Sequence, residues 1–176
     1  MEQWLKIDKK FHIIFHIMFY FVIIFFFSNL SFAQEPIHGV VVNVTDGDIV
    51  TVWEKEKQYK IRLYGIDTPE KEQDFGMKAK KFTANMVFNK SLTVIPKEID
   101  EYGRIVGIIY IGEKCLNEEL VKNGLAWVYK KYCSEPFCDK WLKLEKEARE
   151  NKSGLWIDTD SVPPWNFRKG LTTGKG

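Results

Sequence analysis

Residues 59–70 read YKIRLYGIDTPE, a stretch in which a strand passes into a tight turn. Apolar and polar side chains alternate along its first half, which is typical of a half-buried strand. One face carries Tyr59, Ile61 and Leu63, and the other carries Lys60, Arg62 and Tyr64. Pro69 ends the strand and holds Thr68 extended. The stretch therefore predicts a strand over residues 59–66, followed by a stiff turn that places Glu70.

Four further β-rich runs flank this strand, two before it and two after it: Ile37–Val44, Ile49–Trp53, Leu92–Ile95 and Arg104–Ile111. Asp46-Gly47, a strong hairpin-turn signal, joins the first two runs. The polar turn Asp100–Gly103 separates the last two. The chain therefore offers five short strands.

Three helices are expected between and after these strands. The first has one apolar face, formed by Phe75, Ala79, Phe82 and Met86. The second is expected to be capped by Asn117 and to stop at Gly124. The third is expected to start near Ser134 and to end before Gly154. The order β-β-β-α-β-β-α-α predicts an α+β domain, a five-stranded Greek-key β-barrel of the OB-fold type with three helices.

The first 33 residues differ in composition from the rest. Met1–Lys10 is polar and basic, an apolar run extends to Phe27, and Ser31-Phe32-Ala33 offers a small-x-small site. This layout is typical of a secretory signal peptide and predicts cleavage after Ala33. The alternative is an uncleaved membrane anchor through residues 11–27, which approach the ~17-residue minimum for a span.

The leader sets the expected organisation and location of the protein. Residues 1–33 are the signal peptide, residues 34–158 the folded domain, and residues 159–176 an extended C-terminal tail. We expect an exported protein, periplasmic or secreted, that is a monomer and meets a membrane only through an uncleaved leader.

The cysteines agree with export. Cys133 and Cys138 lie five positions apart and would be free to pair in an oxidising compartment. Zinc is the competing interpretation, but two thiols with no nearby His make an incomplete ligand set. Cys115 is expected to be a buried, inert thiol.

Composition excludes several kinds of chemistry. The 176 residues carry 26 Lys+Arg against 24 Asp+Glu and are 45% hydrophobic, which excludes disorder and a highly basic nucleic-acid tail. Beyond residue 33 the only His is His38, which excludes Ser-His-Asp triads, multi-His zinc sites and His-based nucleases. There is also no Gly-rich phosphate loop. Carboxylates and arginines are what remain.

Arginines are scarce, so their positions are informative: the chain has only Arg62, Arg104, Arg149 and Arg168, against 22 lysines. Arg62 lies within a predicted strand and Arg104 opens another. Guanidinium forks match phosphoryl oxygens, aspartates collect a hard divalent cation, and a free Glu can orient or deprotonate water. Each element alone has an ordinary interpretation as a turn residue or a solvated strand residue. Together they favour phosphodiester hydrolysis.

Three motifs, in order and with family-like spacing, resemble the staphylococcal-nuclease-like thermonucleases: Val44–Asp48 (VTDGD), Ile61–Glu70 (IRLYGIDTPE) and Asp100–Arg104 (DEYGR). The resemblance covers roughly residues 37–157 and continues through Leu116–Ala126. It implies an OB-fold, Ca²⁺-dependent endonuclease of an exported bacterial subgroup. Such an enzyme would hydrolyse DNA and RNA with little sequence preference and leave 3′-phosphate ends.

The same resemblance implies roles for individual residues. The implied calcium ligands are the side chains of Asp48 and Asp67 and the backbone carbonyl of Thr68, with Asp46 behind them. The implied catalytic residues are Glu70, as general base or water orienter, and Arg62 and Arg104, as the phosphate clamp. Tyr102 matches a position near the nucleotide phosphate. The base-stacking tyrosines of the family match Tyr129 and Tyr132 only loosely, because Lys130 and Lys131 shift the spacing.

The rival hypothesis is a catalytically inactive OB fold that binds nucleic acid or serves as an interaction module. After residue 33 the net charge is only +1 (23 basic minus 22 acidic), which is modest for a stoichiometric nucleic-acid binder. Every matching catalytic position is also filled, which favours the enzyme. Five lysines are candidate phosphate contacts, with ordinary solvated surface as the alternative: Lys78, Lys80, Lys81, Lys130 and Lys131.

Overall fold

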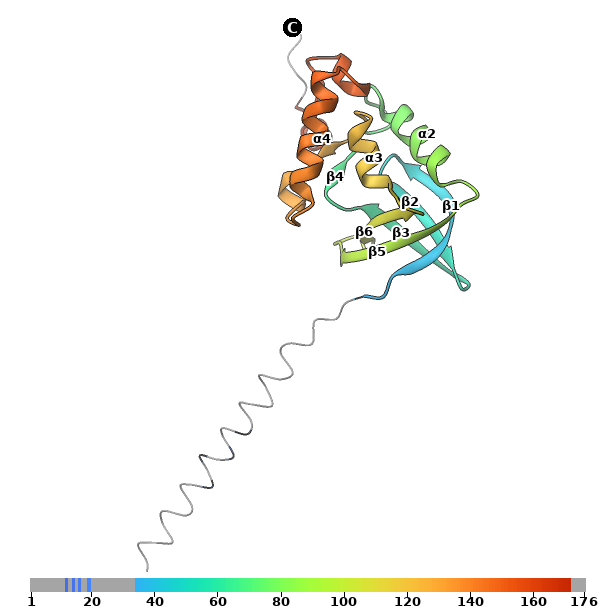
Figure 1. Cartoon of the computed structure of the whole chain (residues 1–176), viewed down its shortest axis with the longest axis vertical. Coiled ribbons are helices and arrows are strands. Elements are labelled where there is room, and N and C mark those ends of the chain that lie inside the picture. Colours follow the sequence, from blue (N-terminus) through green and yellow to red (C-terminus); the bar gives the residue numbers. More distant parts are fainter. Residues whose placement is uncertain (1–11, 13, 15, 17–18, 20–33, 172–176) are drawn as a thin grey trace, which may run out of the picture. The chain divides into compact units, whose positions relative to one another are not determined.

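Five strands close into a barrel in the computed structural model of this chain (Figure 1). The structure describes residues 34–171 and, before them, positions 12, 14, 16 and 19. The signal peptide predicted over residues 1–33 and the alternative anchor over residues 11–27 therefore lie almost wholly outside the described residues. Within the described part, no helix combines the length and the apolar character that crossing a membrane requires.

The barrel strands are β1 (Ile37–Asp46), β2 (Ile49–Glu54), β3 (Lys57–Leu63), β5 (Ser91–Ile99) and β6 (Ile105–Ile111). They follow the spatial order β3-β2-β1-β5-β6, and every neighbouring pair is antiparallel. A parallel pairing of β3 with β6, in which Ile61 lies opposite Ile105, closes the sheet. The predicted five-stranded α+β barrel of the OB-fold type is confirmed.

Three two-residue strands were not predicted: β4 (Ile66–Asp67), β7 (Lys114–Cys115) and β8 (Trp127–Val128). β7 pairs with β6, and β4 pairs with β8. The strand predicted over residues 59–66 instead ends at Leu63, because Gly65 turns the backbone with a φ of 69°. After this turn, Asp67 points into the protein and is fully buried.

The helices are α2 (Gly76–Val87), α3 (Leu116–Lys122), α4 (Cys138–Glu150) and the short α5 (Pro164–Phe167), with two 3₁₀ turns, η1 (Lys130–Tyr132) and η2 (Gly154–Ile157). α2 packs on β1, and α3 packs between β6 and α4 (Figure 1). The three predicted helices are therefore present. α4 begins at Cys138 and not near Ser134, because a turn precedes it.

The prediction that Asn117 caps α3 is wrong. The helix begins at Leu116, and its cap position has no side-chain hydrogen bond. Asn117 is fully buried instead: its Oδ1 accepts the Ile109 N–H at 3.1 Å, and its Nδ2 donates to the Tyr64 carbonyl at 2.9 Å. A helix-initiating Asn can serve as a cap or as an interior bridge, and tertiary packing selects between the two.

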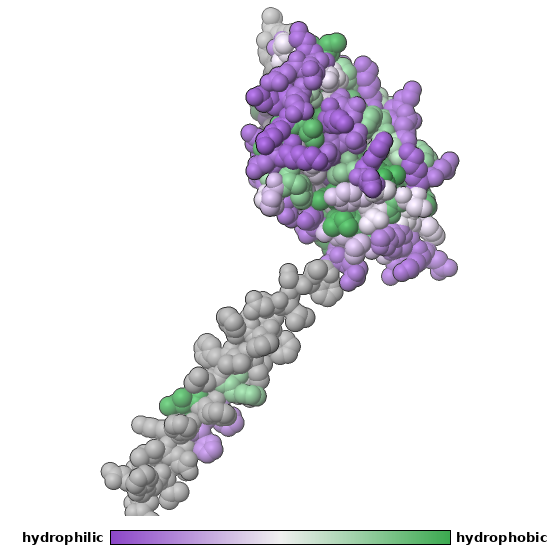
Figure 2. All heavy atoms as spheres, in the orientation of Figure 1, coloured by the Kyte–Doolittle hydropathy of each residue, from purple (hydrophilic) through white to green (hydrophobic). Residues whose placement is uncertain are grey.

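Two apolar clusters form the core. The larger one fills the barrel and the contacts of α2, α3 and α4 with it. The smaller one contains Trp127, Ala148, Leu155 and Trp156, and Trp165 of the tail packs against it. The sequence predicted an extended tail over residues 159–176. The structure instead contains the short helix α5 in this segment, and Trp165 of that helix packs against the domain. On the face seen in Figure 2, hydrophilic side chains cover most of the folded part, with smaller hydrophobic areas between them.

The cysteines separate into a pair and a single thiol. Cys133 and Cys138 form a disulfide that links the end of η1 to the start of α4. Cys115 is free and half-buried, and burial raises its thiol pKa to about 11. A thiol with so high a pKa is protonated at neutral pH, as an inert thiol should be.

Candidate active site

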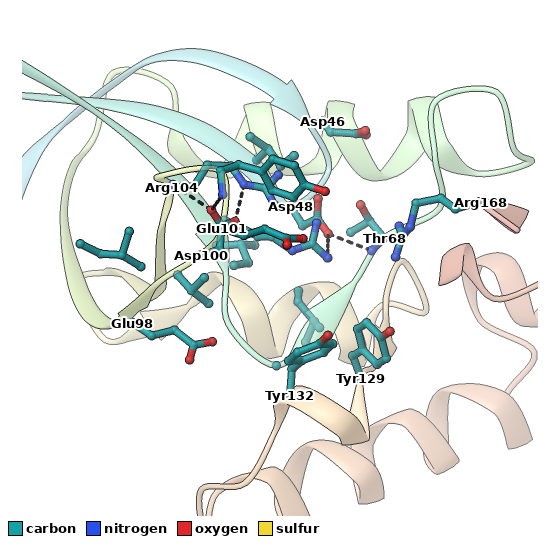
Figure 3. A pocket seen from close by; sticks show the side chains of 18 of the residues that line it. Asp46, Asp48, Thr68, Glu98, Asp100, Glu101, Arg104, Tyr129, Tyr132 and Arg168 are labelled. Atoms are coloured by element: carbon teal, nitrogen blue, oxygen red, sulfur yellow. Dashed lines mark hydrogen bonds and ion pairs between the residues drawn. The ribbon is translucent and has the colours of Figure 1, made fainter. Parts of the chain in front are cut away.

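A cavity of about 640 Å³ opens at one rim of the barrel (Figure 3). Its walls come from the β1–β2 turn, β3, the segment after β4, the β5–β6 turn, η1 and the C-terminal tail. The charged and tyrosine side chains that line it are Asp46, Asp48, Arg62, Glu70, Glu98, Asp100, Glu101, Tyr102, Arg104, Tyr129, Tyr132 and Arg168. Segments that are far apart in sequence thus supply one polar hollow.

The β1–β2 turn brings Asp48 beneath the cavity. The N–H of Gly47 donates to Asp46 Oδ1 at 2.8 Å, which tightens the turn. A Cβ at Gly47 would lie 2.7 Å from Thr68 Oγ1, so only glycine lets the turn approach so closely. Asp48 is 3% exposed, and its Oδ2 accepts the Thr68 N–H at 3.3 Å.

Arg62 joins the two buried aspartates. Its Nη2 donates to Asp67 Oδ1 at 2.7 Å and lies 3.4 Å from Asp48 Oδ2. Burial alone would lower the pKa of Arg62, but the two carboxylates raise it above its ordinary value. The guanidinium therefore remains charged at the cavity wall.

For Asp48, burial outweighs the effect of its charged partner, so its ionised form is disfavoured. Burial raises its pKa to about 6; Arg62 offsets part of this effect, and the negative charge of Asp67 adds to it. An acid with this pKa is ionised at neutral pH at the expense of folding free energy. A cation placed beside it would relieve that penalty.

Arg104 lies on the other side of the cavity from Arg168, as Figure 3 shows. Its Nε donates to Asp100 Oδ2 at 2.6 Å, and the other oxygen of Asp100 accepts the backbone N–H of Arg104 and of Tyr102. These hydrogen bonds outweigh desolvation and lower the pKa of Asp100. Asp100 thus fixes the direction of Arg104 from the β5–β6 turn.

Glu70 begins the loop before α2 and reaches the cavity. Its backbone N–H donates to Gln73 Oε1 at 2.9 Å. The loop folds back so closely that a Cβ at Gly76 would overlap the carbonyl oxygen of Glu70. The Glu70 carboxylate accepts from Arg168 Nη1 at 2.6 Å.

Arg168 is a site residue that sequence reasoning missed. It lies in the tail, 98 positions after Glu70, and its Nη2 also donates to Asp67 Oδ2 at 2.7 Å. The available signal was the scarcity of arginine, because three of the four arginines line this one cavity. The fourth, Arg149, pairs with Glu145 and lies over the ring of Trp156.

The three predicted tyrosines all line the cavity but differ in how far their rings are exposed to solvent. Tyr102 is 75% exposed, with its ring 5.1 Å from the Arg104 guanidinium. Tyr132 is 48% exposed. Tyr129 is half-buried, because Trp165 stacks on it with ring centroids 4.6 Å apart. One face of Tyr129 is therefore closed to a base. Glu98 and Glu101, which were not predicted, line the same rim.

The five candidate lysines do not line this cavity. Lys78, Lys81, Lys130 and Lys131 are exposed, and Lys80 is half-buried. The Lys78 ammonium lies over the ring of Phe75, and that of Lys131 over the ring of Tyr132. Their placement favours the interpretation as ordinary surface.

Asp48 and Asp67 carry oxygen atoms of the kind that hard cations bind, and in this structure Arg62 and Arg168 pair with these carboxylates. The hydroxyl of Thr68 is buried and has no hydrogen-bond partner among the described residues. The Asp48 carboxylate lies next to the Thr68 backbone N–H, and Asp67 precedes Thr68 in the chain. No group of three or more His, Cys, Asp or Glu side chains within the described part could hold a metal ion. A cation here would therefore need backbone oxygen and water in addition to the two aspartates.

Comparison with known proteins agrees with this geometry. The family described as "Staphylococcal nuclease homologue" matches residues 60–158. An "Uncharacterized endonuclease" of Escherichia coli is 39% identical over 150 residues, which cover 85% of this chain and 96% of that protein. A "Micrococcal nuclease" of Shigella flexneri is 36% identical over 146 residues, covering 78% and 83%. An "Uncharacterized endonuclease" of Haemophilus influenzae is 37% identical over 130 residues, covering 73% and 71%.

Proposed function

This chain belongs to the staphylococcal nuclease family and is a nuclease, and from that premise we propose its detailed activity. We propose that it is a Ca²⁺-dependent endonuclease that hydrolyses DNA and RNA with little sequence specificity. Its products would carry 3′-phosphate ends. The observation that supports this proposal best is the cavity that Arg62, Arg104, Glu70 and Asp48 share, with the buried Asp67 paired to Arg62.

The proposed reaction assigns a task to each of these side chains. Arg62 and Arg104 bind the phosphate as bidentate clamps and stabilise the charge that develops on its oxygens. Glu70 orients a water molecule and accepts its proton as the water oxygen bonds to phosphorus. The bond from phosphorus to the 5′ oxygen breaks, and the released 5′ oxygen takes up a proton. A 3′-phosphate and a 5′-hydroxyl result.

Asp48, Asp67 and the carbonyl of Thr68 would hold the cation. Bound Ca²⁺ would neutralise part of the phosphoryl charge as a Lewis acid. The raised pKa of Asp48 supports this ligand set, because a cation beside that carboxylate would stabilise its ionised form. The inactive binding module is not favoured, because no catalytic position that the family resemblance identifies is lost.

Digestion assays test the proposal directly. The purified protein should digest plasmid DNA, single-stranded DNA and RNA with Ca²⁺ and stop in excess chelator. The DNA fragments should prime a polymerase only after a phosphatase has removed their 3′-phosphates. Equal digestion in chelator would exclude the calcium site, and priming without phosphatase would exclude the product chemistry.

A pair of variants tests the metal ligands. Asp48→Asn should abolish the response to Ca²⁺, because it removes a charged ligand. Asp139→Asn is the matched control, since Asp139 is exposed on α4 away from the cavity. A Ca²⁺ response in Asp48→Asn equal to that of the control would rule out this assignment.

We also propose that the protein is exported and acts as a monomer. The leader pattern of residues 1–33 supports export, and so does the Cys133–Cys138 disulfide, because such bonds persist in oxidising compartments. Mass spectrometry of the exported protein should find Gln34 as the first residue. An intact Met1 would favour the membrane anchor instead, and light scattering would reveal any oligomer.

A further inference from the structure

The C-terminal tail returns to the nuclease cavity and places a third arginine there. Arg168 follows α5, and its side chain is 41% exposed. Its Nη1 donates to Glu70 Oε1 at 2.6 Å, while its Nη2 donates to Asp67 Oδ2 at 2.7 Å. One planar guanidinium thus bridges the two carboxylates, a geometry that an ammonium group cannot reproduce.

Aromatic packing holds the tail in this position. Trp165 stacks on Tyr129 with an angle of 17° between the rings, and it meets Trp127 edge-on at 6.4 Å. Both partners belong to the domain, so the tail is seated only three residues before Arg168. The side chain therefore approaches the cavity from a fixed base.

A second link ties the tail to the backbone of Glu70. The side-chain amide of Gln73 accepts the Glu70 N–H at 2.9 Å through Oε1, and it donates to the Val162 carbonyl at 2.9 Å through Nε2. One amide thus connects the start of the tail to Glu70. The tail reaches Glu70 at its backbone through Gln73 and at its carboxylate through Arg168.

The ion pair with Arg168 is the only one that Glu70 makes among the described residues. Asp67 has a second cationic partner, because Arg62 holds its other oxygen. Removing Arg168 would therefore leave Asp67 paired and Glu70 unpaired. A half-buried carboxylate without a partner would sample several rotamers and spend less time facing the reacting water.

We propose that Arg168 is a positioning residue of the nuclease site, which the tail delivers to hold the Glu70 carboxylate toward the cavity. This inference rests on the proposed role of Glu70 in orienting water. It assigns a function to residues 163–168, which lie beyond the part matched by the family, residues 60–158.

The test measures turnover and binding separately. Arg168→Ala should lower kcat by about 10-fold to 100-fold, because misplacing a catalytic group by a small distance has effects of this order. KM should remain within about twofold. Affinity for a single-stranded oligonucleotide, measured by fluorescence polarisation in excess chelator, should be unchanged. Arg168→Lys should recover part of kcat, since its ammonium can pair with Glu70 alone.

Coupling to Glu70 distinguishes positioning from a general structural effect. In a Glu70→Gln background, Arg168→Ala should cause little further loss, because the carboxylate that it positions is already gone. Trp165→Ala should also lower kcat, because it removes the packing that seats the tail. Lys169→Ala, at an exposed neighbouring position, is the matched control and should match the wild type. Circular dichroism and thermal melting should show that each variant is folded.

Three results would overturn the inference: an unchanged kcat in Arg168→Ala, losses that add fully in the Glu70→Gln background, or weakened oligonucleotide binding that accounts for the lost activity. The last result would make Arg168 a phosphate contact. An inactive wild-type protein would instead overturn the proposed function, so the two failures are distinguishable.

Discussion

The guanidinium of Arg62 donates to Asp67 across 2.7 Å, although the two residues lie on different strands, β3 and β4, joined by a turn at Gly65. The Asp67 side chain is 1% exposed, whereas the Arg62 side chain is 19% exposed. A buried carboxylate therefore holds the guanidinium of Arg62, which lines the cavity. A substitution at Arg62 that keeps its positive charge should affect chemistry more than folding, because the buried aspartates keep a cationic partner.

Arg62→Lys keeps the positive charge but loses the planar fork. We expect turnover to fall by about 10²-fold or more, since removing one stabiliser of transition-state charge has effects of this size. The melting temperature should change little, because an ammonium can still pair with Asp67. Initial rates of DNA digestion, with calorimetry for folding, measure both quantities.

Arg149→Lys is the matched control, because Arg149 pairs with Glu145 outside the cavity. Its turnover should equal that of the wild type. Equal activities in the two lysine variants would remove Arg62 from the mechanism.

Asp48→Asn should stabilise the cation-free protein at neutral pH. The pKa of Asp48 is about 6 in the folded protein against an ordinary 3.8, so its ionised form disfavours folding. The destabilisation is absent below pH 4, where the group is protonated in both states, and complete above pH 6. The free energy of unfolding of the variant should exceed that of the wild type by about 3 kcal/mol at pH 8 and by well under 1 kcal/mol at pH 4.

Urea unfolding in excess chelator at the two pH values measures this difference. Asp139→Asn, at an exposed position, should show no such pH-dependent gain. A wild-type protein that is as stable as Asp48→Asn at pH 8 would contradict the raised pKa.

Asn117→Ala should destabilise the fold. Its side chain bridges the Ile109 N–H and the Tyr64 carbonyl inside the protein, and both groups would lose a partner. Each unsatisfied buried group costs about 1–3 kcal/mol, so we expect a loss of about 2–5 kcal/mol in the free energy of unfolding.

Asn123→Ala provides the comparison, because Asn123 is exposed and bonds only within α3 and its cap. Its effect should stay below about 1 kcal/mol. Equal losses at the two positions would show that the buried bridge contributes nothing special.

Cys115 should resist alkylation in the native protein. Burial raises the pKa of its thiol to about 11 from an ordinary 9.0. Because the thiolate is the reactive form, labelling by iodoacetamide at pH 8 should be about 100-fold slower than for a normal thiol. Unfolding in urea should restore the ordinary rate, and rapid native labelling would contradict the burial.

Short-range patterns were enough to predict most of the barrel. The alternation along Tyr59–Leu63 identified a strand with one buried face, and Asp46-Gly47 identified the hairpin that carries Asp48. The same reasoning failed for Asn117, where a cap and an interior bridge have the same sequence signature. It also extended β3 past Gly65, because a single glycine does not reveal the direction in which the chain will turn.

The aspartates, Glu70, Arg62 and Arg104 could be singled out from residue types near predicted turns, because each turn places its side chains at the end of a strand. Arg168 could not be placed in this way. Its position depends on the packing of Trp165 against Tyr129 and on an ion pair with Glu70, a residue 98 positions earlier in the sequence. Local periodicity governs strands and turns, whereas such a long-range contact exists only once the barrel and α4 have formed the surface on which the tail docks.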